Sequence, residues 1–382
     1  MIRSKVAVIK CQTYDEALVF ESVKKGIDLL GGLDAFVKSG EKIVLKPNVL
    51  IGSDPAKCVT THPSVFKAVG RLFQSAGAGV SYGDSSAVGS CEFNLRRAGL
   101  KQVGDAAGFQ VADFDHGREV SYPDALLAKK ITLVNAVLDA DGVVSLPKLK
   151  THGLTRMTGA VKNQFGCVPG LLKGQFHVKL PDPYAFSTML VDLNTFIRPR
   201  LYVMDAIEGM EGNGPRSGKA RRLGVLLLSS DPVALDATAC KLINLDPELV
   251  PTSQPGEKSG LGTCHFDNIE ILGDSLEPLI IKDFQVVRKA APAAAGGFFR
   301  TIIKNMATPR PVIDPLKCTA CGTCVNLCPV GSAALDWIQL KAGKIPQYTY
   351  SRCIRCFCCQ ETCQEGAISV KIPWLGKIVF RH

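Results

Sequence analysis

Apolar residues recur with two different periods along roughly the first 280 residues of the chain. Short apolar or alternating runs predict strands at 5–10, 41–48, 79–86, 130–135, 142–148, 200–206 and 222–230. Between them, residues 14–30 and 62–77 have helical spacing, and the first of these places Val19, Val23 and Ile27 on one face. Strands that alternate with helices of about ten or more residues pair in parallel. We therefore predict an α/β fold, a layered and mostly parallel sheet with helices on both faces.

The pattern changes near residue 282. Residues 282–311 mix Ala, Gly and Pro with basic residues and a short apolar stretch, which predicts a linker that packs against its neighbours. A basic amphipathic segment that touches a membrane or a partner is the alternative. Residues 312–382 hold nine cysteines. The prediction is thus an α/β domain over 1–281, a linker over 282–311 and a small C-terminal domain over 312–382.

Length and composition agree with this division. The chain has 382 residues, 46% of them hydrophobic, which is enough for two or three domains and a large core. Its N-terminus carries charge early, without an apolar signal core, and no run reaches the roughly 18 apolar residues of a membrane span. We predict a cytoplasmic protein with no membrane span. In a reducing compartment, clustered cysteines are metal ligands more often than disulfides.

The formal net charge of +10 admits acidic partners but does not choose among them. Nucleic-acid binding is not expected, because no run of basic residues is interleaved with aromatic residues.

Two cysteine runs of equal spacing dominate the C-terminal domain. The first is C-x2-C-x2-C-x3-C-P, made by Cys318, Cys321, Cys324, Cys328 and Pro329. The second, made by Cys353, Cys356, Cys359 and Cys363, keeps the spacing but has Gln364 in place of the proline. Such runs hold iron–sulfur clusters, and the fourth cysteine of each run ligates the other cluster. Zinc is the rival metal, but it usually takes two separated C-x2-C pairs.

The spacing predicts two [4Fe–4S] clusters. Cluster 1 takes Cys318, Cys321, Cys324 and Cys363, and cluster 2 takes Cys353, Cys356, Cys359 and Cys328. Cys358 lies off the pattern and is expected to be inert or packed. Six further cysteines, of which Cys167 is a candidate for reactivity, share no ligand spacing and are mostly expected in the core: Cys11, Cys58, Cys91, Cys167, Cys240 and Cys264.

Residues 312–370 resemble the bacterial-type two-cluster ferredoxin family, which implies one-electron transfer at low potential. Residues 311–382 carry more basic than acidic side chains, unlike free-standing clostridial ferredoxins, which are typically acidic. A basic face steers an acidic electron donor or acceptor, such as a soluble ferredoxin or flavodoxin. The alternative is that the negative charge of the clusters simply cancels these residues.

Polar and basic residues follow the predicted strands of the larger domain, at the edge where α/β sheets bind ligands. The densest stretch is 146–170, with many basic and few acidic residues. We predict an anionic small-molecule substrate, with His152 and Lys162 as candidate proton donors. The candidate binding residues are Lys46, Asn48, Asp84, Lys148, Lys150, Arg156, Asn163, Arg216 and Lys219.

The Gly-rich stretch 204–222 is not a nucleotide-binding P-loop, because Asn213 stands where the first glycine is required and Ala220 replaces the metal-binding hydroxyl. No G-x-G-x-x-G follows a strand either, which disfavours a nicotinamide reaction. A candidate divalent cation site comprises Asp205, Glu208 and Glu211. The alternative is a solvated acidic turn that pairs with the nearby Arg216 or Lys219.

The motifs KPN, GDS, PKLKTH, TGAVKNQFG, DAIEGMEGNGP and SSDPVALDA, spread over residues 5–275, resemble the domain-of-unknown-function family numbered 362, which is often fused to ferredoxin modules. The resemblance implies a shared pocket but no reaction.

Three functions therefore stay open. The first is iron–sulfur electron transfer that serves a reductive reaction in the α/β domain, as in a ferredoxin-linked oxidoreductase. The others are a ligand-binding or redox-sensing protein and an electron-transfer subunit of a larger complex.

Overall fold

The computed structural model describes residues 3–288, 308–340 and 343–373. Most of the predicted linker, residues 289–307, lies outside the described residues.

Among the described residues, the larger domain is built on one central sheet of ten strands in the order β12-β1-β11-β10-β7-β2-β3-β4, with β8 paired to β10 and β9 paired to β8. Most neighbours pair in parallel; β11 is antiparallel to both β1 and β10, and β9 is antiparallel to β8. The predicted fold class, an α/β fold with a mostly parallel sheet, is therefore confirmed. The strands are β1 (Ser4–Lys10), β2 (Lys42–Pro47), β3 (Gly79–Tyr82), β4 (Gln110–Val111), β7 (Gly142–Leu146), β8 (Lys148–His152), β9 (Arg156–Thr158), β10 (Leu201–Glu211), β11 (Lys219–Ser229) and β12 (Ile269–Gly273).

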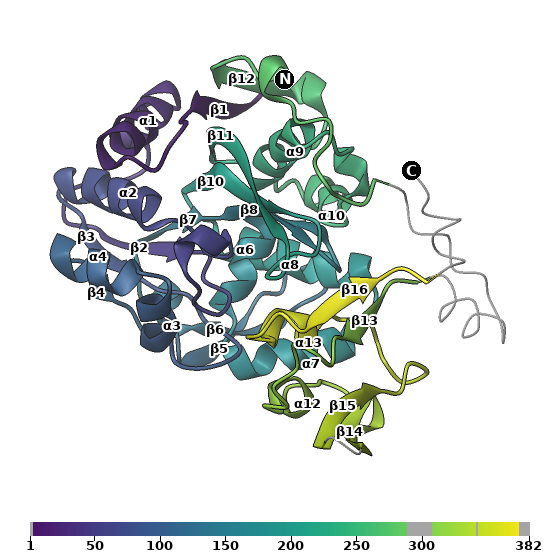
Figure 1. The fold of residues 1–382 in the computed structure, drawn as a ribbon. Coiled ribbons are helices and arrows are strands. Elements are labelled where there is room, and N and C mark those ends of the chain that lie inside the picture. Colours follow the sequence, from purple (N-terminus) through teal and green to yellow (C-terminus); the bar gives the residue numbers. More distant parts are fainter. Residues whose placement is uncertain (1–2, 289–307, 341–342, 374–382) are drawn as a thin grey trace.

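Helices cover both faces of this sheet (Figure 1). One face carries α1 (Glu16–Leu29), α2 (Pro63–Ser75), α3 (Cys91–Arg97) and α4 (Leu100–Ala107). The other carries α6 (Ala160–Asn163), α8 (Pro183–Ile197), α9 (Pro232–Leu242) and α10 (Ser253–Lys258), with α7 (Lys173–Lys179) at one end. As predicted, Val19, Val23 and Ile27 share the buried face of α1. Asp15 and Asp231 accept backbone N–H bonds at the first turns of α1 and α9, which satisfies donors that a helix start leaves unpaired.

Two segments differ from the sequence prediction. The predicted strand at 130–135 does form, as β6 (Lys130–Val134), but it pairs with β5 (Gly117–Ser121) in a separate hairpin that leads to α5 (Asn135–Leu138). The stretch 204–222, predicted as a loop, is mostly strand, because β10 runs to Glu211 and β11 begins at Lys219. When a hydrophobic strand continues into polar residues, the sequence does not indicate where its hydrogen bonding to the neighbouring strand ends.

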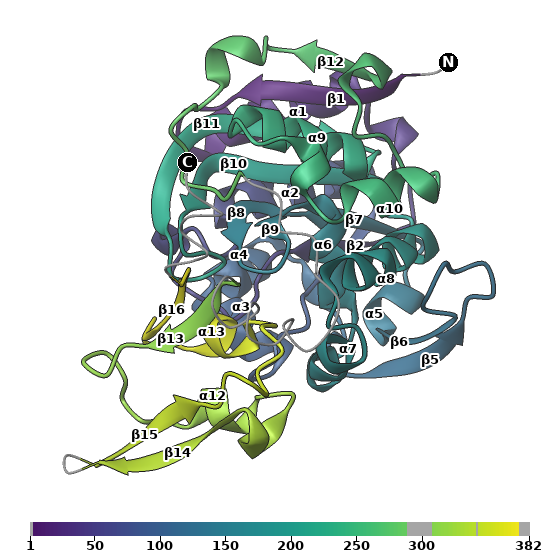
Figure 2. The same ribbon diagram turned by 90° about the vertical axis from the view of Figure 1, so that its right-hand side faces the viewer.

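The C-terminal module has two short antiparallel sheets and two one-turn helices between them. β13 (Arg310–Ile313) pairs with β16 (Ile368–Lys371), and β14 (Leu335–Leu340) pairs with β15 (Gly343–Tyr348). The helices are α12 (Thr323–Asn326) and α13 (Cys358–Thr362). Both views place this module at one end of the larger domain, with β14 and β15 farthest away from it (Figures 1 and 2). Among the described residues, no helix is long and apolar enough to cross a membrane.

Candidate functional site

The module gathers eight of its cysteines around two small cavities. One cavity is lined by Cys318, Cys321, Cys324 and Cys363. The other is lined by Cys328, Cys353, Cys356 and Cys359. Each cavity thus combines three cysteines of one run with the fourth cysteine of the other run, the grouping that the spacing predicts.

The backbone of the two cysteine runs repeats as well as the sequence does. Ala320 and Gly322 in the first run have φ of 53° and 79°, and the equivalent Arg355 and Phe357 in the second run both have φ of 63°. A left-handed conformation is unfavourable for a residue with a side chain, and it persists only where the surroundings require it. Turns of this kind point backbone N–H groups into a concavity that suits an anion. Both loops therefore have the shape of a cradle for a negatively charged cluster.

The cysteine side chains are crowded and partly buried. Burial, followed by the negative charges of Cys363, Cys318 and Cys321, raises the pKa of Cys324 to about 11. Two donors meet the sulfurs: the Tyr348 hydroxyl lies 3.2 Å from Cys359 Sγ, and the Ala367 amide lies 3.3 Å from Cys363 Sγ. Four thiolates so close together need a bound cation to stay ionised, and the iron of a cluster supplies that charge.

The module docks on the turn between β10 and β11. The Gln360 Nε2 amide donates to Asn213 Oδ1 at 2.9 Å and to the Asn213 and Gly214 carbonyls at 3.1 and 3.2 Å. The Val370 N–H donates to the same Asn213 Oδ1 at 3.0 Å. Phe357 packs so close to Gly153 that a Cβ there would lie 3.1 Å from its ring. Backbone and side-chain contacts thus fix the second cysteine run against the sheet of the larger domain.

A cavity of about 590 Å³ lies between the module and the larger domain. The larger domain contributes four lysines and three amides, and the module contributes residues that include Cys328, Pro329, Cys358 and Glu361. Cys328 and Pro329 also line the second cysteine cavity, so the two cavities share a wall. The polar lining from the larger domain is Asn48, Asp84, Ser85, Lys150, Thr158, Lys162, Asn163, Lys173, Gln175, His177 and Lys179.

A buried polar network supports the floor of this interdomain cavity. Lys46, which is fully buried, pairs with Asp84 at 2.8 Å and donates to Asn163 Oδ1 at 3.1 Å. Asn48 Nδ2 donates to the same oxygen at 3.0 Å, and Lys150 donates to Asn48 Oδ1 at 2.7 Å. Charges in a low-dielectric interior are tolerated when they are paired and hydrogen-bonded. The ends of β2, β3 and β8 and helix α6 thus act as one unit.

A hydrogen bond between His152 and Glu361 joins the two domains at the edge of the cavity. His152 Nε2 lies 2.8 Å from Glu361 Oε1, and both groups are largely buried. Burial lowers the pKa of His152 to about 4, with a further contribution from Lys162. Burial alone would raise the pKa of the Glu361 carboxyl, but Lys162, His152 and His177 outweigh it and hold that pKa well below its usual range. Glu361 is therefore an anion that faces a cationic wall.

Two lysines of the cavity have pKa values that burial lowers to the range of neutral pH. Burial, then repulsion from Lys162, lowers the pKa of Lys150 to about 7. Burial also lowers the pKa of Lys173, to about 8, and its ammonium donates to the Ser85 carbonyl. Lys162 is half-buried, and its side chain makes no hydrogen bond or ion pair with any other described residue. Its ammonium is thus available to a bound anion.

The predicted residues divide into those that the fold brings to this cavity and those that it does not. Asn48, Asp84, Lys150, Lys162 and Asn163 line it, while Lys46 and His152 support it from behind. The remaining four face elsewhere, and of these Lys148 pairs with Asp205. Arg156 donates to the carbonyls of Leu249 and Val287, Lys219 is exposed on β11, and Arg216 lies near Cys363.

The candidate cation site does not form among the described residues. Asp205 is instead paired with Lys148 at 2.8 Å, and it also accepts from the Tyr14 hydroxyl and the His62 N–H. Glu208 lies against the Cys58 thiol, and Glu211 accepts from the Gln285 N–H. On β10 these three carboxylates bind different partners, and their oxygens do not converge. Asp205, Glu208 and Glu211 are therefore structural.

Several cavity residues escaped the sequence prediction, among them Lys173, His177 and Glu361. Lys173 and His177 lie four residues apart on α7, a spacing that puts both on one face of a helix and was visible in the sequence. Glu361 sits between two cysteines of the second run, and only the docking of the module brings it to the larger domain. As expected, the six scattered cysteines are buried. Burial raises the pKa of Cys167 to about 12, which argues against the reactivity expected of it.

Family models match both parts of the chain. A model for a domain of unknown function, DUF362, matches residues 43–241, and a model for a 4Fe-4S dicluster domain matches residues 310–364. The chain is 37% identical over 262 residues to a thylakoid-associated protein of Synechocystis sp., an alignment that covers 68% of this chain and 81% of that one. It is 34% identical over 61 residues to an uncharacterized ferredoxin of Methanocaldococcus jannaschii, covering 16% of this chain and 77% of that one.

Solved structures match the chain at lower similarity. The lactate racemase apoprotein from Thermoanaerobacterium thermosaccharolyticum aligns with a TM-score of 0.39 and 14% identity over 62% of this chain and 56% of that chain. A structural-genomics protein from Thermotoga maritima aligns with a TM-score of 0.37 and 13% identity over 61% of this chain and 60% of that chain. The chain thus spans less than two thirds of either solved structure.

Proposed function

The chain belongs to the DUF362 family and carries a 4Fe-4S dicluster domain, which supports an iron–sulfur electron-transfer role, and we propose that it delivers electrons to an anionic small molecule in the interdomain cavity. The observation that carries the proposal is the shared wall: Cys328 and Pro329 line both a cysteine cavity and the lysine-lined cavity. A group held by Cys328 lies next to whatever fills that cavity.

We assign two [4Fe–4S] clusters to the cysteine cavities. Cys318, Cys321, Cys324 and Cys363 hold cluster 1, and Cys353, Cys356, Cys359 and Cys328 hold cluster 2. When bound, such clusters supply one electron at a time at potentials set by their surroundings. The Tyr348 hydroxyl and the Ala367 amide, which donate to sulfur, are groups of the kind that raise these potentials.

The larger domain binds and orients the substrate. Lys162 and Lys173 meet its negative charge, and the amides of Asn48 and Asn163, already held by Lys46 and Lys150, fix its position. Apolar residues such as Phe165 and Val178 line the same cavity, so the substrate has an apolar body beside its anionic group. Lys150, whose pKa is near 7, is better placed than His152 to move a proton, because Glu361 already occupies the His152 Nε2 atom.

The electron partner is an acidic protein such as a ferredoxin or flavodoxin, and the reaction takes place in a reducing compartment such as the cytoplasm. Cys321 is exposed at the first cysteine cavity, which shares no lining residue with the lysine-lined cavity. Exposed Lys317 lies in the same loop and suits an acidic partner.

The first experiment is a redox titration of anaerobically purified protein. About eight irons per chain with reversible electron paramagnetic resonance signals below roughly −300 mV are expected. Clusters that decay on reduction favour a redox sensor or a structural role instead. Cys358→Ser is the matched control for Cys356→Ser: the first retains the full iron content, and the second loses about half of it, since Cys358 is not a ligand.

A second experiment tests the lysine-lined cavity without assuming a reaction. Binding of inorganic phosphate and of aliphatic and aromatic carboxylates is measured by calorimetry on the loaded protein. Lys162→Met is expected to weaken binding at least tenfold, and Lys129→Met, which removes an exposed lysine of the larger domain, leaves it unchanged. If both variants bind these anions with equal affinity, the cavity is not the substrate site. That result would not affect the proposed electron-transfer role.

A further inference from the structure

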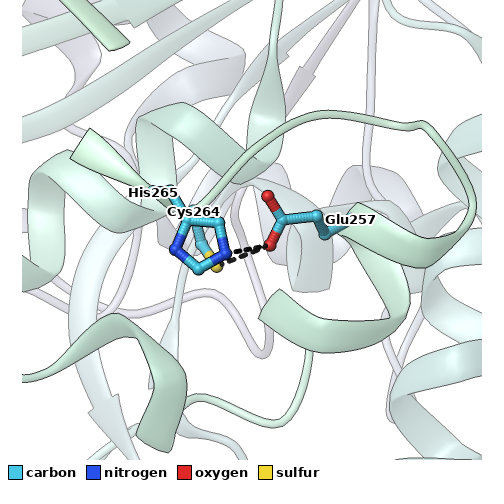
Figure 3. Close-up of side chains that lie close together, drawn as sticks. All are labelled: Glu257, Cys264 and His265. Atoms are coloured by element: carbon cyan, nitrogen blue, oxygen red, sulfur yellow. Dashed lines mark hydrogen bonds and ion pairs between the residues drawn. The ribbon is translucent and has the colours of Figure 1, made fainter. Parts of the chain in front are cut away.

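Three side chains of different chemistry meet in the larger domain, outside the lysine-lined cavity. Glu257 is on α10, and Cys264 and His265 follow in the loop that leads to β12 (Figure 3). Their ligand atoms all lie within 4.8 Å of one another. Among the described residues, no other group of three His, Cys, Asp or Glu side chains converges in this way.

The three atoms are arranged around one carboxylate oxygen. Cys264 Sγ lies 3.2 Å and His265 Nε2 lies 3.1 Å from Glu257 Oε2, as the dashed lines in Figure 3 show. Ligands bound at about 2.0–2.3 Å around a tetrahedral ion are separated by distances of this order. A small outward movement of the Glu257 carboxylate therefore opens a position that all three atoms can reach.

The loop that carries Cys264 and His265 is held in place by hydrogen bonds of the neighbouring residue Thr263. Thr263 donates its N–H to Asp231 at 3.2 Å, and its hydroxyl donates to Glu257 Oε1 at 2.9 Å. Gly262 packs on the same Asp231 so tightly that a Cβ would lie 1.8 Å from the carboxylate. Because Asp231 also caps α9, the loop is anchored to a helix of the core. Thr263 is the kind of outer hydrogen-bonding partner that orients a ligand to a metal.

Access to the position is from solvent. The Cys264 side chain is buried, whereas the side chain of His265 is 56% exposed and that of Glu257 is 31% exposed. Three protein ligands with one open side leave room for water in the fourth position.

We propose that Glu257, Cys264 and His265 form a site for one divalent transition-metal ion, with zinc as the ion that this set of sulfur, nitrogen and carboxylate oxygen suits best. Binding forms one bond each to sulfur, nitrogen and oxygen, releases the thiol proton to solvent and involves no oxidation or reduction. The bound ion ties α10 to the start of β12. The site lies outside residues 43–241, which the family model matches, and shares no residue with the lysine-lined cavity.

The test uses the whole chain with its clusters in place. After anaerobic incubation with zinc sulfate and gel filtration, zinc and iron are measured together by mass spectrometry. The native protein is expected to retain one zinc per chain more than His265→Ala does, with equal iron in both. His116→Ala, which removes another exposed histidine paired with a carboxylate, is the matched control and retains the native zinc content. His265 is exposed enough for its variant to fold, and Glu257→Gln is the second variant.

Zinc-edge X-ray absorption then reads the ligands directly, without interference from iron. One sulfur at about 2.3 Å with nitrogen and oxygen at about 2.0 Å is the expected first shell. A shell of four sulfurs means that zinc has entered a cluster position, and a shell without sulfur means surface binding. Either result, or equal zinc in the native protein and His265→Ala, overturns the proposal and reduces the three residues to a surface ion pair beside a buried thiol.

Discussion

The two parts of this chain are stabilised in different ways. The larger domain has a continuous core that runs from β1 to Phe284 and Val286, with apolar residues from strands and helices on both faces of the sheet. Among the described residues of the C-terminal module, the hydrophobic cluster contains Cys324, Leu335, Cys359 and Ile368, and two of these four are cysteines of the two cavities. A domain of this size rarely buries enough apolar surface to fold without disulfides or metal.

One chain thus combines a larger domain that folds by hydrophobic burial with a module whose folding depends on its cofactor. In the module, bonds from cysteine to iron take the place of apolar contacts. The free energy of cluster binding therefore contributes to the folding of the module. In the larger domain, the polar network around Lys46 and Asp84 is built into an interior that is already stable.

Removal of the clusters is the change with the largest expected effect. Treatment with a chelator and an oxidant should unfold the module and leave the larger domain folded, because only the module has a small core built partly from the cluster cysteines. Hydrogen-exchange mass spectrometry checks this: amides of β13 to β16 should lose protection, while those of β2, β7 and β10 keep it. If the amides of the module stay protected from exchange without iron, the module does not depend on its clusters for folding.

A smaller effect is expected when the polar interior of the larger domain is broken. Lys46→Met leaves the Asp84 carboxylate buried without its cation, which should cost about 3–5 kcal/mol of unfolding free energy. Denaturant unfolding followed by circular dichroism measures this loss. Lys24→Met, which breaks the exposed Lys24–Asp28 pair on α1, is the control and should change little. Equal losses in both variants would mean that the buried pair does not contribute as the structure indicates.

The smallest effect is a pH dependence at Asp236, which accepts the Ala160 and Val161 N–H groups and so positions α6 with Lys162. Burial raises the pKa of Asp236 from 3.8 to about 7. Because the folded pKa lies above the unfolded one, the stability that the protonated group contributes is fully present below about pH 4. It is lost as pH rises through about 7.

Relative to Asp236→Asn, the native protein should therefore lose stability between about pH 4 and 7. Circular-dichroism melts of the two proteins at several pH values give this difference. The exposed cap Asp182 serves as control through Asp182→Asn. A stability difference that is flat across this range would show that the Asp236 pKa is not raised.

Local sequence was informative wherever a short pattern carries its own chemistry. The strand and helix periods predicted the mostly parallel sheet, and the cysteine spacing predicted the two groups of four that line the cavities. The sequence did not indicate that the predicted strand at 130–135 pairs outside the central sheet. The pairing partner of a strand depends on packing between residues far apart in the chain. Arg156, in the densest basic stretch, was placed in the site by proximity alone, yet its guanidinium turns to the Leu249 carbonyl.

The fold class, the cofactor domain and most of the residues around Lys46 follow from the sequence alone, because periodicity, ligand spacing and strand ends are local properties. The contact of Glu361 with His152, and the place of Cys328 in the wall between the second cysteine cavity and the lysine-lined cavity, appear only in the folded molecule. They depend on docking through Gln360 and Asn213, two amides about 150 residues apart that meet only when both domains have folded.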